Sequence, residues 1–260
     1  MTSQRIDFDR WAGTYDRTRG LSPSVLRPML DALGPAGGRA LLDIGGGTGN
    51  FAAAFIDAGF RTTLCDLSPE MAARAGAKGI DAAAATAERL PLRDGSFDCA
   101  VSINVVRHIT NRPTAYREAV RVLRAGPLVV KVSTEETQRG DWVVEYFPSL
   151  LARQPRYQPE AEVVDELRTA GFASVEVRRF VYEDAADGSF QALKRFPDHL
   201  LDDETARNTA VFQRLPEAEL TAGLERMRRD RESGALAAVI SRYAEAARTY
   251  GDGSIFIARV

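Results

Sequence analysis

The sequence predicts an α/β fold built on a doubly wound sheet of seven strands, with a mainly helical cap. Two observations lead to this prediction. Short apolar segments alternate with stretches of helical character along much of the chain, which is the pattern of a parallel sheet with helical crossovers. The first of these segments, residues 40–44, runs into a glycine-rich turn at 45–49 and then into a helix. Such a turn lets the backbone approach a nucleotide-like ligand closely, because glycine has no side chain and tolerates positive φ.

The predicted elements follow in chain order. Amphipathic helices are expected at residues 6–19 and 22–33, the second with Ser22 as N-cap and Pro23 at its first position. Further helices are predicted near residues 50–58, 68–77, 112–123 and 160–170, and strands at residues 40–44, 62–66, 80–84, 97–103, 128–133, 174–181 and 254–260. Ligands of such sheets bind outside the carboxyl ends of the strands. This predicts that Asp43, Asp66, Thr86 and Asn104 lie along one edge.

Two segments lie outside this alternating pattern. Residues 134–158 are rich in aromatic side chains, and residues 183–250 are largely helical, with the clearest helix beginning at Pro216. Both segments leave the predicted sheet at the ligand edge, so we expect them to form a cap over the site. The interpretation is a single domain over 1–260, with lid helices in 1–34 and a core of about 38–133, 159–182 and 252–260.

Composition restricts the class of protein. The chain has 260 residues, of which 45% are hydrophobic, and a formal net charge of −2, so we expect one large core and no basic surface for nucleic acid. The sequence has no apolar run long enough to span a bilayer and no secretory core near Met1, which predicts a cytoplasmic location without membrane association. Cys65 and Cys99 fall inside predicted strands and are expected to be buried thiols. The oligomeric state is not predicted.

Five motifs occur in order at ordinary spacing. They are Asp43-Ile44-Gly45-Gly46-Gly47-Thr48-Gly49, Asp66-Leu67-Ser68-Pro69-Glu70-Met71, Thr86-Ala87-Glu88-Arg89-Leu90-Pro91, Phe97-Asp98 and Glu118-Ala119-Val120-Arg121-Val122-Leu123. In these motifs the chain resembles the class I S-adenosylmethionine-dependent methyltransferases, strongly over residues 39–133 and loosely in the flanks. The resemblance implies a Rossmann-like methyltransferase fold with an antiparallel last strand, and S-adenosylmethionine as cofactor.

Two alternatives stay open at this point. The segment Gly47-x-Gly49-x-x-Ala52 also satisfies the permissive dinucleotide fingerprint, which leaves a nicotinamide or flavin enzyme, such as a nicotinamide-dependent reductase, open. That alternative is disfavoured because the later motifs match the methyltransferase pattern and the sequence has no Tyr-x-x-x-Lys pair. A protein of the same fold that keeps the cofactor for a non-methylating role, such as cyclisation, is the second alternative.

The resemblance also implies roles for single residues. Asp43 would bind the methionine amino group directly or through water, Asp66 would bind the ribose hydroxyls, and the backbone at Gly45, Gly46 and Gly47 would lie against the cofactor. Around the adenine would lie Leu67, Met71, Ala87 and Glu88, and Asn104 would lie beneath the methionine portion. Thr86 stands where the family commonly has an acid, although a hydroxyl can still accept a hydrogen bond. An amino-terminal helix with Tyr15 and Trp11 would close over the site.

The acceptor side is less defined by the sequence. His108 is the candidate catalytic base because it follows the fourth predicted strand and an imidazole titrates in a useful range. Candidate acceptor contacts are Trp11, Trp142, Tyr146, Phe147 and His199. The sequence lacks the Asn-Pro-Pro-Tyr type of motif and has no carboxylate cluster beside Asn104 to hold magnesium. We therefore expect a metal-free, in-line methyl transfer to a small, partly apolar organic acceptor, on an oxygen, nitrogen or carbon atom that the sequence does not specify.

Overall fold

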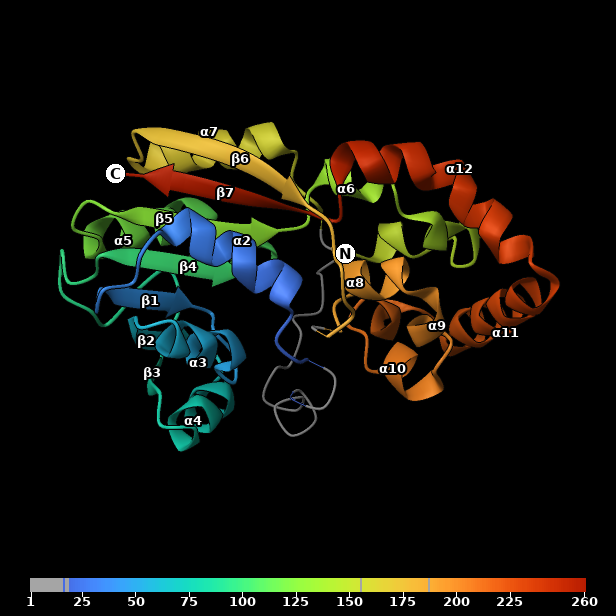
Figure 1. Ribbon diagram of the computed structural model, residues 1–260, viewed down its shortest axis with the longest axis horizontal. Helices are drawn as coiled ribbons and strands as arrows, with labels where there is room; N and C mark the ends of the chain where they lie inside the picture. Colours follow the sequence, from blue (N-terminus) through green and yellow to red (C-terminus); the bar gives the residue numbers. More distant parts are fainter. Residues whose placement is uncertain (1–15, 17–18, 155, 187) are drawn as a thin grey trace.

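A seven-stranded sheet of order β3-β2-β1-β4-β5-β7-β6 forms the core of the computed structural model (Figure 1), which describes residue 16 and residues 19–154, 156–186 and 188–260. The strands are β1 (Ala40–Ile44), β2 (Arg61–Asp66), β3 (Asp81–Ala84), β4 (Cys99–Ile103), β5 (Pro127–Val132), β6 (Ser174–Phe180) and β7 (Gly253–Arg259). Strands β1 to β5 pair in parallel, and β7 lies antiparallel between β5 and β6. The predicted doubly wound sheet and antiparallel last strand are confirmed.

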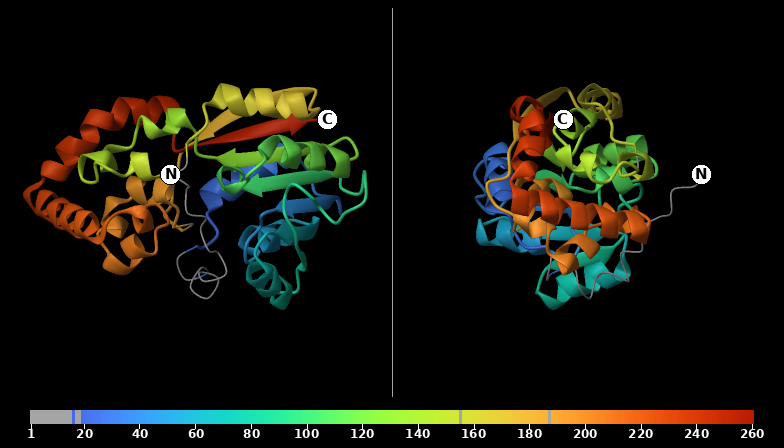
Figure 2. Two further views of the ribbon diagram at one scale, coloured as in Figure 1. Left: turned by 180° about the vertical axis from the view of Figure 1, so that it is seen from behind. Right: turned by 90° about the vertical axis from the view of Figure 1, so that its right-hand side faces the viewer.

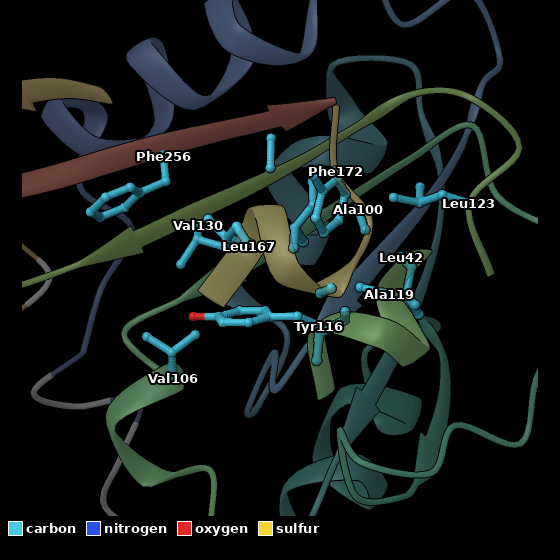
Figure 3. Packing of buried hydrophobic residues seen from close by; sticks show 14 of the residues in the cluster. Leu42, Ala100, Val106, Tyr116, Ala119, Leu123, Val130, Leu167, Phe172 and Phe256 are labelled. Carbon is cyan, nitrogen blue, oxygen red and sulfur yellow. The ribbon is translucent and has the colours of Figure 1, made fainter. Parts of the chain in front are cut away.

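Helices cover both faces of the sheet. They are α2 (Pro23–Leu33), α3 (Asn50–Asp57), α4 (Pro69–Ala77), α5 (Arg112–Val122) and α7 (Glu160–Ala170). Successive side chains of a strand point to opposite faces, so Val129 of β5 packs with α2 and α3, whereas its neighbours Leu128 and Val130 pack with α5 and α7. Figure 3 shows the hydrophobic cluster on the face covered by α5 and α7, which includes Tyr116, Leu167 and the strand residue Val130. This two-sided burial explains why the central strands β1, β4 and β5 are largely apolar.

A second lobe stands beside the sheet and forms the cap (Figures 1 and 2). Its elements are α6 (Glu135–Gln138), η2 (Trp142–Glu145), η3 (Leu151–Arg153), α8 (Phe190–Arg195), α9 (Pro197–Leu200), α10 (Asp203–Arg207), η4 (Phe212–Arg214), α11 (Glu217–Ser233) and α12 (Ala235–Tyr250). The chain enters this lobe after β5 and again after β6. Residues from both segments share one hydrophobic cluster, in which Phe147 packs on Phe212 with ring centroids 4.7 Å apart.

The structure differs from the sequence-based expectation at the amino-terminal end. Residues 1–15, 17 and 18, which include Trp11 and Tyr15, lie outside the described residues. Helix α2 was expected to belong to a lid, but it covers the sheet, because Val25, Met29 and Leu33 are buried against strand side chains. The predicted strand 97–103 begins only at Cys99, since Phe97 pairs with Leu123 as an isolated bridge.

Two further findings concern the class of protein. Cys65 and Cys99 are free and buried, as the sequence predicted. Among the residues that the structure describes, no helix is both long enough and apolar enough to cross a membrane.

Candidate active site

The glycine-rich turn after β1 has glycine at positions where a side chain would not fit. Gly45, Gly47 and Gly49 have φ values of 75°, 58° and 84°, a region that favours glycine. A Cβ atom at Gly45 would lie 2.5 Å from both Val105 methyl groups, and one at Gly46 would lie 2.5 Å from Asp43 Oδ2. The turn therefore requires glycine both for its dihedral angles and for the space around it.

Asp66, at the carboxyl end of β2, is held in a fixed orientation. Its Oδ2 accepts a hydrogen bond of 2.9 Å from the Gly47 backbone N–H, and its Oδ1 accepts one of 2.9 Å from Ser68 N–H. Ser68 in turn caps α4, where its Oγ accepts from Met71 N–H at 3.1 Å. Each carboxylate oxygen can accept more than one hydrogen bond, so the fixed carboxylate can also receive ligand hydroxyls.

Asp43 is a buried carboxylate with an incomplete set of hydrogen bonds. Its side chain is 1% exposed, and Oδ2 makes no hydrogen bond among the described residues. Burial, with a smaller contribution from the charge of Asp66, raises the pKa of Asp43 to about 7. A buried acceptor of this kind fits a cationic donor such as an ammonium group, which would satisfy Oδ2 and favour the ionised form.

Two adjoining cavities meet at these residues. The cofactor cavity, of about 180 Å³, contains the carboxyl ends of β1, β2 and β4 in its lining, and a smaller cavity of about 70 Å³ lies on the side of Asp43. Both are lined by Arg19, Gly45, Gly47, Ile103 and Asn104. Together their linings include Asp43, Gly45, Gly46, Gly47, Asp66, Leu67, Met71, Thr86, Ala87, Glu88 and Asn104. The structure thus brings together every described residue that the resemblance implied for the cofactor.

The remaining edge of the cofactor cavity comes from the loop after β3. Thr86 is exposed and Glu88 is half-buried. Burial alone would raise the pKa of Glu88, but hydrogen bonds, including one of 3.2 Å from Asn111 N–H to Oε1, hold that pKa below its ordinary value. Glu88 therefore places an ionised acceptor at this edge, beside the hydroxyl of Thr86.

Asn104 connects the cofactor cavity to the cap. It follows β4 with φ of 61°, the one described non-glycine residue with positive φ, a conformation that asparagine tolerates better than most residues. Its Oδ1 accepts a 2.8 Å hydrogen bond from Lys131 Nζ, and Nζ also donates to Tyr182 OH at 2.7 Å. Lys131 is fully buried at the end of β5. In the sequence, the signal for this residue is a lysine inside the otherwise apolar run of residues 127–132.

A third cavity, which we call the cap cavity, lies between the core and the cap. It measures about 90 Å³ and is lined by Arg19, Asn104, Arg107, His108, Lys131, Ser133, Tyr157, Ser189, Phe190, Gln191, Thr209, Ala210 and Val211. Four of these, Arg19, Asn104, His108 and Ala210, also line the cofactor cavity. The two cavities therefore adjoin, and a molecule in the cap cavity would lie next to the cofactor.

His108 lies where a catalytic group would be needed, since it lines both the cofactor cavity and the cap cavity. It ends the short helix η1 (Val106–His108) after β4. Burial lowers the pKa of His108 to about 3, helped by the positive charges of Arg107 and Arg214. The imidazole is consequently neutral at neutral pH, and its low basicity disfavours a role as general base in this state of the protein.

The other candidate acceptor contacts lie elsewhere. Trp142, Tyr146 and Phe147 are at most 4% exposed and belong to the hydrophobic cluster of the cap, outside the linings of these three cavities. Aromatic spacing alone could not distinguish a cap core from an acceptor wall. His199 is exposed on α9, packs edge-on against Phe196 and lines none of the three cavities.

The burial of Trp142 leads to a prediction about stability. Its Nε1 donates to the Lys194 carbonyl at 3.1 Å, and its ring packs edge-on against Tyr146. We expect Trp142→Ala to destabilise the cap by about 3–5 kcal/mol, the usual cost of removing a large buried aromatic ring. Thermal unfolding should show the loss, while the affinity for S-adenosylhomocysteine changes little. A Trp142→Ala variant of unchanged stability would contradict the assignment to the cap core.

Comparison with known proteins identifies the family. Residues 42–130 match a methyltransferase domain. The chain is 34% identical over 182 residues to the malonyl-[acyl-carrier protein] O-methyltransferase of Serratia marcescens, an alignment that covers 65% of this chain and 71% of that protein. It is 39% identical over 157 residues to a ubiquinone/menaquinone biosynthesis C-methyltransferase of Paracoccus denitrificans, with coverage of 54% and 63%. The chain belongs to the class I S-adenosylmethionine-dependent methyltransferase family.

A solved structure agrees at the level of the fold. A putative methyltransferase from an antibiotic biosynthesis pathway of Anabaena variabilis superposes with a TM-score of 0.79 over 94% of this chain and 99% of that one, at 24% identity. The chain spans less than two thirds of the length of the Paracoccus relative. Membership of this family is incompatible with the nicotinamide-dependent reductase that the glycine turn alone left open.

Proposed function

We propose that this protein transfers a methyl group from S-adenosylmethionine to a small, partly apolar organic molecule by in-line displacement without a metal ion. The observation that carries the proposal is the adjoining pair of cavities: the cofactor cavity and the cap cavity share Arg19, Asn104, His108 and Ala210. S-adenosylmethionine bound in the cofactor cavity would therefore face an acceptor bound in the cap cavity. The cap cavity has apolar walls in Tyr157, Phe190 and Val211, which suit an apolar body.

The two carboxylates at the ends of β1 and β2 support the binding of this cofactor. Asp43 Oδ2 would accept from the amino group, and Asp66 would accept from the ribose hydroxyls while Gly47 and Ser68 hold it in place. When bound, the cofactor supplies a methyl group already activated by a positive sulfur. The chain then has to orient the acceptor and exclude water, and orientation alone is worth about 7–11 kcal/mol of a bimolecular barrier.

Lys131 and His108 serve this orientation in different ways. Lys131 holds the Asn104 side chain by a hydrogen bond at the junction of the two cavities. His108, with its lowered pKa, contributes a neutral imidazole to the same junction. We propose that His108 positions the acceptor and that the methyl transfer depends on proximity rather than on proton abstraction by this residue.

Binding and turnover measurements test the proposal. S-adenosylmethionine and S-adenosylhomocysteine should bind in calorimetry, and NADH should not. The full chain is incubated with S-adenosylmethionine and a panel of small aromatic compounds that offer a hydroxyl group, an amine or a nucleophilic carbon atom. At least one of them should yield S-adenosylhomocysteine and a product heavier by one methylene unit. Tight cofactor binding with no methylated product, alongside rearrangement of an acceptor without cofactor consumption, would instead support the cyclisation alternative.

A further inference from the structure

The charge of the cap cavity says more about the acceptor than its shape does. Arg19, Arg107 and Lys131 line it, and its described lining contains no aspartate or glutamate. A fourth basic group, Arg214, lies close enough for its positive charge to repel that of Arg107 and to contribute to the lowered pKa of His108. The cavity is therefore positive over much of its wall.

Two of these cations lack the carboxylate partners that their neighbours have. Arg112 pairs with Glu166 at 3.1 Å, and Arg156 pairs with Glu162 at 2.7 Å. Within the described part of the chain, no carboxylate lies within 4.0 Å of Arg107 or Arg214. Arg107 instead contacts the phenol of Tyr157, donating to its OH at 3.1 Å with the guanidinium 4.5 Å from the ring centre. Two neighbouring cations that have no carboxylate partner in this part of the chain form a site that an anionic ligand would stabilise.

A buried amide adds a second, independent observation. Gln191 lines the cap cavity and is 4% exposed. Its amide lies close enough to the Asp141 carboxyl to oppose the rise in pKa that burial causes there, but neither Nε2 nor Oε1 makes a hydrogen bond of ordinary length among the described residues. Buried polar atoms nearly always have a partner, so an amide left without one beside a cavity indicates that a polar ligand completes it.

The position of Arg107 indicates which part of the acceptor it would bind. Arg107 lines the cap cavity and a neighbouring small cavity that includes Val132, Thr134 and Gln158, but neither of the two cavities on the cofactor side. An anionic group paired with Arg107 would therefore lie at the end remote from the cofactor. The rest of the molecule would extend past Asn104 and His108 to the cofactor.

We propose that the acceptor carries an oxyanionic group, either a carboxylate or a phosphate monoester, which Arg107 binds with help from Gln191. This group, which we call the handle, serves for recognition and does not itself receive the methyl group. This inference rests on the proposed function, because it assigns the acceptor of the same site. Guanidinium groups match both oxyanions through paired N–H donors, and the apolar walls accommodate a ring or short chain attached to the handle.

Matched probes test the handle. The full chain is first saturated with S-adenosylhomocysteine, and 4-hydroxybenzoate, 4-hydroxyphenyl phosphate and 4-hydroxybenzamide are then titrated by calorimetry. At least one of the two oxyanions should bind about tenfold or more tightly than the amide, which corresponds to a single charge-assisted hydrogen bond of about 1.5 kcal/mol or more. The tighter of the two identifies the handle as carboxylate or phosphate. Equal affinities for the amide and both oxyanions, or no binding of either oxyanion, overturn the proposal.

Arginine variants locate the effect. In Arg107→Gln the preference for the oxyanion should fall to about twofold or less, with Arg107→Lys intermediate, because lysine keeps the charge but not the paired donors. The control is Arg117→Gln on the exposed side of α5, where the Arg117 side chain donates a hydrogen bond of 3.0 Å to Thr114; it should keep the full preference. All variants should retain the affinity for S-adenosylhomocysteine. An Arg107→Gln protein with the preference intact overturns the proposal, whereas failure of the wild-type chain to bind S-adenosylhomocysteine contradicts the proposed function itself.

Discussion

Replacing Asp66 by Ala should weaken the binding of S-adenosylhomocysteine by about tenfold or more. In the proposed complex this carboxylate accepts hydrogen bonds from two ribose hydroxyls, and a hydrogen bond to a charged group is worth about 1.5–3 kcal/mol. The effect should be large because Gly47 and Ser68 hold the carboxylate in place before the ligand arrives. Calorimetric titration of the wild type and the variant measures the difference directly.

Two further variants separate ligand contact from structural support. Asp66→Asn keeps one acceptor oxygen but removes the charge, so its affinity should lie between those of the wild type and Asp66→Ala. Asp57→Ala, at the exposed end of α3, is the matched control and should bind normally. If Asp66→Ala loses thermal stability but keeps its affinity, then the carboxylate serves only to hold the loop.

The affinity for S-adenosylhomocysteine should increase with pH up to about 7 and then level off. Burial raises the pKa of Asp43 from 3.8 to about 7 in the free protein, so below pH 7 the carboxyl group is mostly protonated. The cofactor ammonium requires the ionised form, and binding must then release a proton. The affinity should fall by up to about tenfold for each pH unit below 7, since one unit corresponds to 1.36 kcal/mol.

The released proton can be counted. Titrations at pH 6 in two buffers of different ionisation enthalpy should give different apparent binding enthalpies. The difference between them, divided by the difference in buffer ionisation enthalpy, should correspond to the release of up to one proton per ligand. Among the described residues, the charge that acts on Asp43 is that of Asp66, which raises its pKa, and Arg19 lines the same cavity. Asp43→Asn should bind more weakly and show neither the proton release nor the pH dependence. Wild-type affinity that stays constant between pH 5.5 and 8 would contradict the contact with the ammonium group.

The cofactor half of the site could be anticipated because it is local in sequence. Each of its groups comes at or just after the end of a parallel strand, and the carboxyl ends of parallel strands meet at one edge of the sheet. Asp43, Asp66, Glu88 and Asn104 needed only the strand pattern and the motif spacing to be placed together. The structure puts them in the linings of two adjoining cavities.

The cap could not be anticipated in the same way. Its aromatic residues Trp142, Tyr146 and Phe147 have the composition of an acceptor wall, yet they pack against residues from 190–240. Whether a large apolar side chain faces a cavity or a core depends on which distant segment covers it, and hydrophobic periodicity does not contain that information. Arg107, Lys131 and Gln191, which do line the cap cavity, come from three separate segments with no common motif.

The sequence by itself thus determined the fold class, the family and the cofactor edge, since these depend on short-range spacing along an alternating β and α pattern. Only the tertiary structure decided what surrounds the acceptor. It buried the expected acceptor aromatics in the cap, lowered the pKa of His108 through burial and nearby arginines, and placed cations from β5 and η1 in the lining of the cap cavity. Burial and charge proximity are properties of contacts between distant segments, which is why they appear only once the chain is folded.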